Sequence, residues 1–494
     1  MSNRNRLLSR AAKHAPLATC LTTALGLSLS AAQAADVPRI RMPSAQSNRD
    51  SVFELPSYIR ENAAKRPAAP MYAPAQPAGP PHYVTTCGDD AAMPMPGTLR
   101  YEVANAADGA TIDLSTLVCS TITLDSVIAI NQDSLYLKGP AAGPSHLTID
   151  AANHSEVFNH FGSSTLLISR LTITHGYYAS SAFPRGGCIY SQGNVGLISS
   201  VVALCTIWSP SVSVPAQGGG VYTNGNLTLV NSTISGSEAF AQNGADANGG
   251  GAYVNGDFKA IYSTISDNTA AALNGANGFA GGVYVHGSVD IEGSTISGNQ
   301  ADRVGALEFS GYAPHTAKVI NSTISNNIGT EYFGGIWTVT PMTLASSTVA
   351  FNRSLSSQRG NGVYSFGSVL TLNSSIIADN SGPDGPSDLD GGNGAAVSGE
   401  FNLITSSTLP PLANTITDCP RLEPLTNNGG TTRTHALLHT SPAIDQGNAG
   451  VLTLDQRGAP RTAGVQADIG SVERQPGEPD ERIFVNGFDG LCDQ

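Results

Sequence analysis

Residues 218–235 read GGGVYTNGNLTLVNSTIS, residues 249–266 read GGGAYVNGDFKAIYSTIS, and residues 280–297 read AGGVYVHGSVDIEGSTIS. Each phrase joins small residues, an apolar–aromatic pair, a polar turn, an apolar alternation and Ser-Thr-Ile-Ser. Looser copies occupy 304–325, 333–350 and 360–379. The last apolar residues of the copies, spaced 31, 31, 28, 25 and 27 residues apart, are Ile234, Ile265, Ile296, Ile324, Val349 and Ile376. Fixed phrases with variable spacers predict a solenoid whose insertions emerge as loops.

The phrases alternate with period 2 and are rich in Val, Ile, Thr and Tyr, which predicts strands. No sustained helical period occurs, and propeller blades need about 40–45 residues. We therefore expect an all-β fold, a right-handed parallel β-helix whose turns stack about 4.8 Å apart. One amide recurs three residues after the Ile or Val of each turn, counting from Ile377 in the last, which predicts a stacked ladder of Asn268, Asn299, Asn327, Asn352 and Asn380.

Six segments before these copies fit additional turns of the solenoid: 111–114, 121–124, 135–138, 147–150, 166–173 and 195–200. Leu99 and Val103, four residues apart, predict a short capping helix at the N-terminal end of the stack. The repeats are expected to fill 97–420, after a Pro- and Ala-rich linker at 35–96. Residues 421–475 are expected to form C-terminal turns or a cap, and 476–494 a tail.

The N-terminus has the organisation of an export signal. Arg4, Arg6, Arg10 and Lys13 precede an apolar stretch at 17–29, and Ala-Gln-Ala at 32–34 is typical of a cleavage site. We expect a signal peptide over 1–34, with a lipoprotein attached at Cys20 as the alternative. No later stretch is apolar enough to span a membrane, so the mature chain is expected to be extracellular or on the outer cell surface, without a transmembrane segment.

Net charge and cysteine content further limit the expected partners and the expected cellular compartment. The net charge is −13, and beyond residue 34 it is 21 basic minus 38 acidic residues, or −17. A nucleic-acid partner is therefore not expected, because such proteins carry a basic footprint. Six cysteines follow the export signal, an even number in an oxidising compartment. Cys188 and Cys205, 17 residues apart, form the most plausible local disulfide.

The glycine–tyrosine and Ser-Thr-Ile-Ser-x-Asn phrases resemble secreted bacterial β-helix proteins of the pectin-lyase-like superfamily and the repeats of polymorphic outer-membrane proteins. Four C-terminal motifs, at 428–438, 441–445, 455–458 and 468–470, resemble the signature of choice-of-anchor β-helix proteins. Residues 482–489 resemble a short tail of some exported proteobacterial proteins. The resemblance implies the fold and an exported location, and it carries no agreed activity.

Catalytic residues are hard to identify. Paired aspartates of galacturonan hydrolases and the Asp-His phrase of pectate lyases are both missing from the sequence, and only nine basic residues lie between 97 and 420. The best catalytic candidates are Arg170 and His175. Positions five apart in an unbroken strand point to opposite faces, so these two converge only if the strand turns before His175. Surface residues on a loop are the alternative interpretation.

Two further groups are candidate binding residues. Asp384, Asp388, Asp390 and Asn393 lie in a Gly-rich loop whose oxygen donors suit Ca²⁺, with a plain solvent turn as the alternative. No other cofactor is expected. An aromatic column follows the glycines of the repeats, and with Leu307 placed at its fourth position it reads Tyr222, Tyr253, Tyr284, Leu307, Trp337 and Tyr364. Strand alternation makes it a sugar-stacking strip, or else a stack that faces inward or lies under loops.

We therefore expect an exported β-helix interaction protein, adhesin-like or glycan-binding, with an extracellular glycan or cell-surface component as its partner. The alternative is a polysaccharide lyase or glycoside hydrolase of the same fold, because fold alone does not decide function. The net charge disfavours polyanionic ligands, so a neutral glycan held by stacking and hydrogen bonds is expected, unless Ca²⁺ bridges to a uronate.

Overall fold

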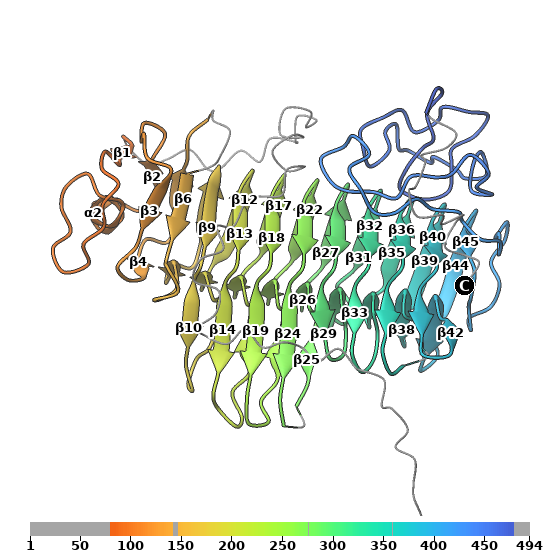
Figure 1. Cartoon of the computed structure of the whole chain (residues 1–494), viewed down its shortest axis with the longest axis horizontal. Coiled ribbons are helices and arrows are strands. Elements are labelled where there is room, and N and C mark those ends of the chain that lie inside the picture. Colours follow the sequence, from red (N-terminus) through yellow and green to blue (C-terminus); the bar gives the residue numbers. More distant parts are fainter. Residues whose placement is uncertain (1–79, 142–146, 275, 358, 479–494) are drawn as a thin grey trace, which may run out of the picture. The chain divides into compact units, whose positions relative to one another are not determined.

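The computed structural model describes residues 80–141, 147–274, 276–357 and 359–478. These residues form a parallel β-solenoid in which each strand pairs with its counterparts one turn before and one turn after (Figure 1). All printed ladder pairs are parallel except the terminal pair β41–β42. The predicted parallel β-helix is therefore confirmed. The export signal and most of the linker, up to residue 79, lie outside the described residues.

Four long sheets and one short sheet run along the solenoid, and we call them A to E. Sheet A holds β1 (His82–Tyr83), β2 (Ala110–Asp113), β5 (Leu135–Lys138), β8 (Thr165–Ser169), β12 (Asn194–Ile198), β17 (Leu227–Val230), β22 (Phe258–Ile261), β27 (Val289–Glu292), β31 (Ala317–Ile320), β35 (Met342–Ala345), β39 (Val369–Asn373) and β44 (Ala396–Glu400). Sheet B holds β3 (Thr121–Thr123), β6 (Leu147–Asp150), β9 (Leu171–Thr174), β13 (Val201–Ala203), β18 (Thr233–Ser235), β23 (Thr264–Ser266), β28 (Thr295–Ser297), β32 (Thr323–Ser325), β36 (Thr348–Ala350), β40 (Ile376–Ala378) and β45 (Leu403–Ile404).

Sheet C holds β4 (Ile128–Ile130), β7 (Phe158–His160), β11 (Ile189–Ser191), β16 (Val221–Thr223), β21 (Ala252–Val254), β26 (Val283–Val285), β30 (Leu307–Phe309), β34 (Ile336–Thr338), β38 (Val363–Phe366) and β43 (Leu389–Gly392). Sheet D holds β10 (Tyr177–Ala179), β14 (Thr206–Ser209), β19 (Glu238–Ala241), β24 (Thr269–Ala272), β29 (Gln300–Ala301), β33 (Ile328–Gly329), β37 (Arg353–Ser354), β41 (Ser381–Gly382) and β42 (Gly385–Pro386). Sheet E holds β15 (Ala216–Gln217), β20 (Ala247–Asn248) and β25 (Gly278–Phe279).

Single residues in the left-handed backbone conformation turn the chain from sheet A to sheet B. Asn231, Tyr262 and Asn321 occupy this corner with φ between 48° and 52°. The segment 166–173, expected to belong to an additional turn, is likewise divided into β8 and β9 by Arg170, whose φ is 53°. A positive φ reverses the side-chain alternation locally, so one repeat can supply two strands to two sheets.

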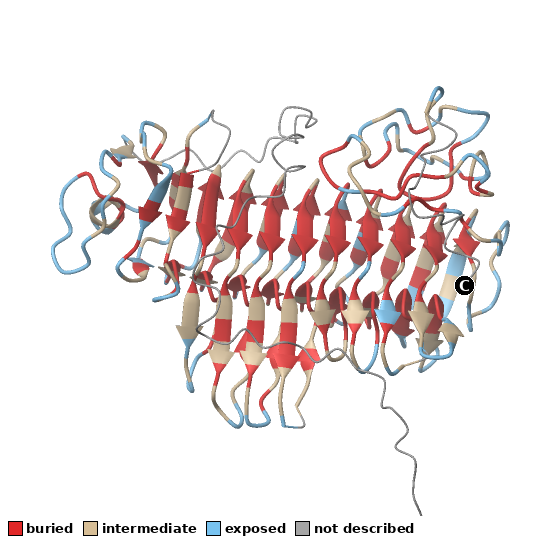
Figure 2. Ribbon diagram, viewed as in Figure 1, coloured by how far each residue is buried: buried red, intermediate tan, exposed pale blue. Residues whose placement is uncertain are grey.

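The core fills the interior of the coil, as Figure 2 shows by the buried strands. The predicted apolar column is present at Ile234, Ile265 and Ile296, each of which is fully buried and in register with the next. At its end the register joins Val349 to Ile377, so Ile377 and not Ile376 continues the column. Successive turns therefore stack like residues on like residues, which buries a continuous apolar core.

The predicted amide ladder is present. From Asn299 to Asn380, each Asn Oδ1 accepts from the backbone N–H and the Nδ2 of the Asn one turn earlier, at 2.8–3.1 Å. Asn268 Oδ1, at the start of the ladder, accepts from Ser237 N at 3.0 Å. A second ladder, which the sequence analysis missed, is formed by the first Ser of each Ser-Thr-Ile-Ser phrase. Its hydroxyls accept from the Ser N–H one turn earlier, as Ser263 Oγ does from Ser232 N at 3.1 Å. Both ladders satisfy buried backbone donors at the corners of the turns that they join.

The N-terminal end carries the expected short helix, α2 (Leu99–Asn105), whose buried Leu99 and Val103 join the main core. Thr98 caps it by accepting from Tyr101 N. Disulfides join Cys87 to Cys119 and Cys188 to Cys205, and Cys419 is also disulfide-bonded. Across the described residues, no helix is long and apolar enough to cross a membrane.

Residues 421–475, expected as further turns or a cap, are placed differently. Their described pairings are isolated bridges such as Leu422↔Leu437 and Thr426↔Thr434, and they contain no named strand. The segment lies against the outer face of sheet B, beside β28 to β40, where Leu437 and Ile469 pack with Ile376 (Figure 1). Instead, bridges from 407, 413 and 416 to β43, β44 and β45 extend the stack at its C-terminal end.

Candidate functional site

The outward-facing column of sheet C contains the aromatic residues singled out in the sequence. Val221 and Thr223 are fully buried in the core, so alternation points Tyr222 to the outside. In register, the column reads Ala129, Asn159, Tyr190, Tyr222, Tyr253, Tyr284, Glu308, Trp337, Tyr364 and Asp390. The outward direction expected for a sugar-stacking strip is therefore present.

The rings of this column differ in exposure: Tyr222, Tyr253 and Tyr364 are buried, whereas Tyr190, Tyr284 and Trp337 are half-buried. Tyr190, Tyr222, Tyr253 and Tyr284 stack with centroids 5.2–5.5 Å apart and planes within 7° of parallel. Tyr222 is only 2% exposed and Tyr253 only 7%, and the guanidinium of Arg185 lies 5.0 Å over the Tyr222 ring. Tyr253 Oη is 2.8 Å from His286 Nε2. Tyr222 and Tyr253 therefore form the covered centre of a stack and are not an open platform for a ligand.

Glu308 interrupts the aromatic column, and this corrects the sequence analysis, which placed Leu307 there. The register joins Leu307 to the core residue Val283 and Glu308 to Tyr284. In the sequence, aligning Gly305 with Gly281 places Glu308 opposite Tyr284, whereas aligning Gly305 with Gly282 places Leu307 there. The first alignment would have predicted the register correctly. Glu308 is 5% exposed, and its Oε2 has no hydrogen-bond partner among the described residues. Burial raises the pKa of this carboxyl to about 8, although the charge of Arg303 opposes the shift.

Arg170 and His175 do not converge. They occupy the two ends of β9, both at positive φ, and four strand residues separate them. Arg170 Nε donates to Gly139 O at 3.3 Å, while His175 Nδ1 lies 3.1 Å from Asp150 Oδ1. Each side chain thus bonds to the preceding turn at its own corner, and the described contacts bring no base beside the guanidinium.

The proposed Ca²⁺ residues divide between different environments. Asp388 is buried and ends the amide ladder, because its Oδ1 accepts from Asn380 N and Nδ2. Burial raises the pKa of Asp388 to about 6. Asp390 lies in the outward column of sheet C and accepts from the Thr408 hydroxyl, whereas Asp384 and Asn393 are exposed. Within the described ranges, no group of three or more His, Cys, Asp or Glu residues is placed to hold a metal ion.

The C-terminal signature motifs hold their segment to the solenoid. Gln456, in the motif at 455–458, donates from Nε2 to Ser294 O and Thr295 Oγ1 and accepts from Thr323 Oγ1 at 2.6 Å. Ser471 N donates to Thr348 Oγ1 at 3.1 Å. The outward Thr and Ser of the repeats are therefore partners for this segment, which explains polar residues at buried positions of sheet B.

His435, in the motif at 428–438, lies in the same interface. Its Nδ1 donates to Glu423 O at 2.6 Å, so the neutral ring accepts at Nε2 from Ser325 Oγ at 2.7 Å. Burial lowers the pKa of His435 to about 4. The folded state thus favours the neutral ring, and stability is lost as the pH falls from about 6.5 toward 4.

Acid is therefore expected to weaken the docking of this segment through His435. At about pH 5 the predicted loss is about 2 kcal/mol relative to neutral pH, since each pKa unit corresponds to about 1.4 kcal/mol. Urea unfolding of the wild type and of His435→Asn at both pH values measures it, because the variant removes this titration and retains the others. An equal pH dependence in the two proteins would contradict the assignment.

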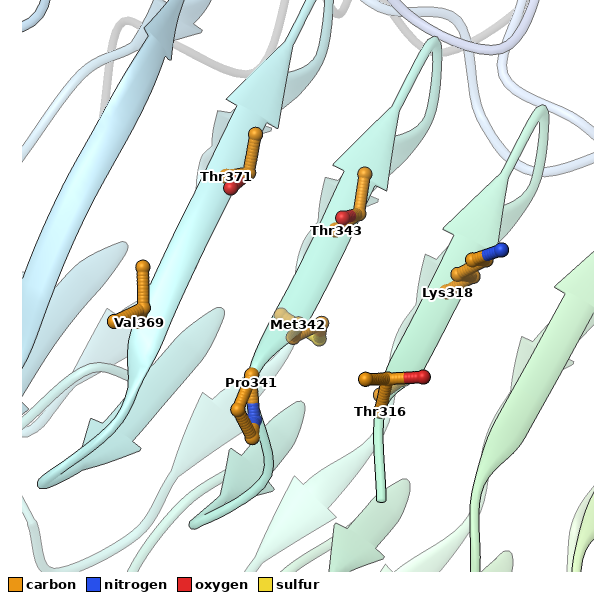
Figure 3. Close-up of a pocket in the computed structure, with 8 residues that line it drawn as sticks. Thr316, Lys318, Pro341, Met342, Thr343, Val369 and Thr371 are labelled. Atoms are coloured by element: carbon orange, nitrogen blue, oxygen red, sulfur yellow. The ribbon is translucent and has the colours of Figure 1, made fainter. Parts of the chain in front are cut away.

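A shallow hollow on the outer face of sheet A was not anticipated from the sequence. It spans β31, β35 and β39, and two outward rows line it (Figure 3). One row contains Lys318, Thr343 and Thr371, which are in register, and the other contains Thr316, Pro341 and Val369. The hollow therefore combines hydroxyls and one ammonium with apolar surface.

Exposed aromatic residues belong to the chain segments that lead into this hollow. Tyr312, four residues before Thr316, is 73% exposed, and Phe366, three residues before Val369, is 44% exposed. Lys318 has no ion-pair partner among the described residues, whereas Lys259, two rungs away, pairs with Asp290 at 2.8 Å. Neither aromatic residue lines the hollow, and Tyr312 acts on Tyr284 in the column of sheet C. The hollow itself therefore offers open hydroxyl and amine groups.

Comparison of the chain with protein-family models, with curated proteins and with solved structures found no match.

Proposed function

We propose that this protein is an exported, cell-surface or secreted β-helix that binds a neutral extracellular glycan at the hollow of sheet A. The observation that carries the proposal is the open hollow itself, where Lys318, Thr343 and Thr371 lie beside the apolar surface of Pro341 and Val369. Sugars are recognised by hydrogen bonds to their hydroxyls and by packing of their apolar ring faces. The sequence resemblance to pectin-lyase-like and choice-of-anchor proteins supports a right-handed coil and an exported location.

Charge supports a neutral ligand. The chain beyond residue 34 carries −17, and a single lysine, Lys318, lines the hollow. Long-range repulsion of polyanions is therefore expected to outweigh one ammonium. Binding of a neutral glycan would change little with salt, because neither stacking nor hydroxyl hydrogen bonds depend on screened charges.

Binding measured against neutral polysaccharides and polyuronates, at low and high salt and with Ca²⁺ or chelator, tests the proposal. We expect Thr343→Val to weaken neutral-glycan binding several-fold, the effect of losing one hydrogen bond worth about 1 kcal/mol. Thr228→Val is the matched control, because Thr228 lies in the same outward row of sheet A but outside the hollow. Unchanged binding by Thr343→Val, or tight and salt-sensitive uronate binding in chelator, would refute the proposal.

A glycan-cleaving enzyme is the second candidate, and Glu308 is the observation that favours it. A carboxylic acid whose pKa is raised to about 8 has the protonation state of a general acid at neutral pH. Release of reducing ends from the same polysaccharides, lost in Glu308→Gln, would replace the binding proposal with this one. The burial of Glu308 makes the binding function our first choice.

A further inference from the structure

The guanidinium of Arg303 is held between two aromatic rings. Its carbon lies 5.1 Å from the centroid of the Phe279 ring and 4.5 Å from that of Tyr332. Tyr332 is 40% exposed, so this stack lies at the surface. Cation–π contacts of this kind are individually weak at exposed sites. A carboxylate that binds the Arg303 guanidinium more strongly can therefore draw it away from these two rings.

The carboxylate of Glu308, five residues after Arg303, is such a partner. Glu308 is buried, its Oε2 has no partner among the described residues, and Arg303 is the cation whose charge acts on it. The titratable neighbour in the column is Tyr284, on which Asp246 and Tyr312 also act. A buried carboxylate without a partner is strongly unfavourable, so ionised Glu308 would be stabilised by pairing with a nearby cation.

The backbone around Arg303 is fixed. Arg303 N donates to Gly278 O at 2.9 Å, and its carbonyl accepts from Phe333 N at 2.7 Å. The carboxylate of Asp302 accepts from Ala272 N and Gly278 N at 3.1 and 2.7 Å. Since these bonds anchor the loop, a response to Glu308 is confined to the Arg303 side chain and does not require the loop to open.

We propose that Arg303 is a two-position switch, stacked on Phe279 and Tyr332 while Glu308 is protonated and paired with the Glu308 carboxylate after it ionises. In the second position the two rings are uncovered and offer a platform for an aromatic or pyranose ring. The pKa of Glu308, about 8, places the transition at mildly alkaline pH. The switch lies away from the hollow of sheet A, so it does not depend on glycan binding there.

Hydroxyl-radical footprinting of the full chain tests the switch. Labelling of Phe279, normalised to the exposed Phe183, is expected to rise several-fold between about pH 6.5 and about 9.5, with its midpoint set by Glu308 ionisation. Glu308→Gln should abolish the rise, and Arg303→Gln should leave Phe279 labelled at both pH values. Glu331→Gln, at an exposed carboxyl, is the control and should behave as the wild type.

Two results would overturn the proposal. One is a wild type whose Phe279 labelling is the same at both pH values. The other is a rise that persists in Glu308→Gln, which would place the titrating group elsewhere. Circular dichroism of each variant at both pH values separates a local side-chain movement from loss of the β-helix, because the switch leaves the backbone unchanged.

Discussion

Replacing Asn327 with alanine is expected to destabilise the β-helix by about 4 kcal/mol, because buried hydrogen-bonding groups lose their partners. Asn327 is fully buried, and its side chain makes five hydrogen bonds. It accepts from the N–H and Nδ2 of Asn299 and donates to Asn352 Oδ1. The change leaves the Asn299 N–H buried without an acceptor, and urea unfolding measures the loss.

Exchanging asparagine for aspartate at one ladder position, and aspartate for asparagine at another, provides the control. Asn327→Asp is expected to be at least as damaging as alanine, since a carboxylate cannot donate to Asn352 and would place a buried charge against its oxygen. Asp388→Asn should not destabilise the protein, because an amide oxygen accepts from Asn380 as the carboxylate does. The Thr405 hydroxyl, which donates to Asp388 Oδ2, can accept from the new amide instead, and the change removes a carboxyl whose pKa burial raises to about 6. Similar losses at both positions would show that the direction of the ladder is unimportant.

Glu308→Gln is expected to make the protein about 3 kcal/mol more stable at neutral pH. The folded-state pKa of Glu308, about 8, lies above its ordinary value of 4.5, so the folded state favours the protonated acid. The stability contributed by this group is complete below about pH 4.5 and is lost as the pH rises toward 8. Glutamine retains the volume of the side chain and cannot ionise, so it avoids this loss.

The measurement is urea unfolding of the wild type and the variant from about pH 4 to 8, with Glu331→Gln as the exposed control. The two curves should coincide at the acid end and diverge as the pH rises. A constant difference across the range would mean that the variant acts by packing rather than by removing an ionisable group. A wild type that is more stable than Glu308→Gln at neutral pH would contradict the prediction outright.

Much of the fold could be predicted because a solenoid uses local information repeatedly. The strand alternation, the Ile column and the amide ladder each recur at one position of every turn, and stacking brings those positions together without any long connection. The helix at Leu99–Asn105 was likewise indicated by its local apolar spacing. The serine ladder was equally visible in the phrase Ser-Thr-Ile-Ser and was overlooked, since small polar residues are typical of turns as well.

The candidate sites were harder to predict because they depend on what covers each outward-facing residue. Alternation left two alternatives for Tyr222 and Tyr253, an outward strip or a stack that faces inward or is covered, and it carries no information on what buries an outward ring. The motif at 455–458 looked like a family signature, and its Gln456 is a contact to residues more than 130 positions earlier. Such long-range partners leave no local pattern in a single sequence.

By itself, the sequence determined the strands and the stacking period, because these follow from backbone alternation and from the repeat of one turn. Only the tertiary structure decided which outward residues are accessible. It placed Glu308 instead of Leu307 in the aromatic column, laid 421–475 against sheet B, and left the hollow beside Lys318 open. Accessibility depends on register and on segments distant in the chain, and neither is encoded in the pattern of one repeat.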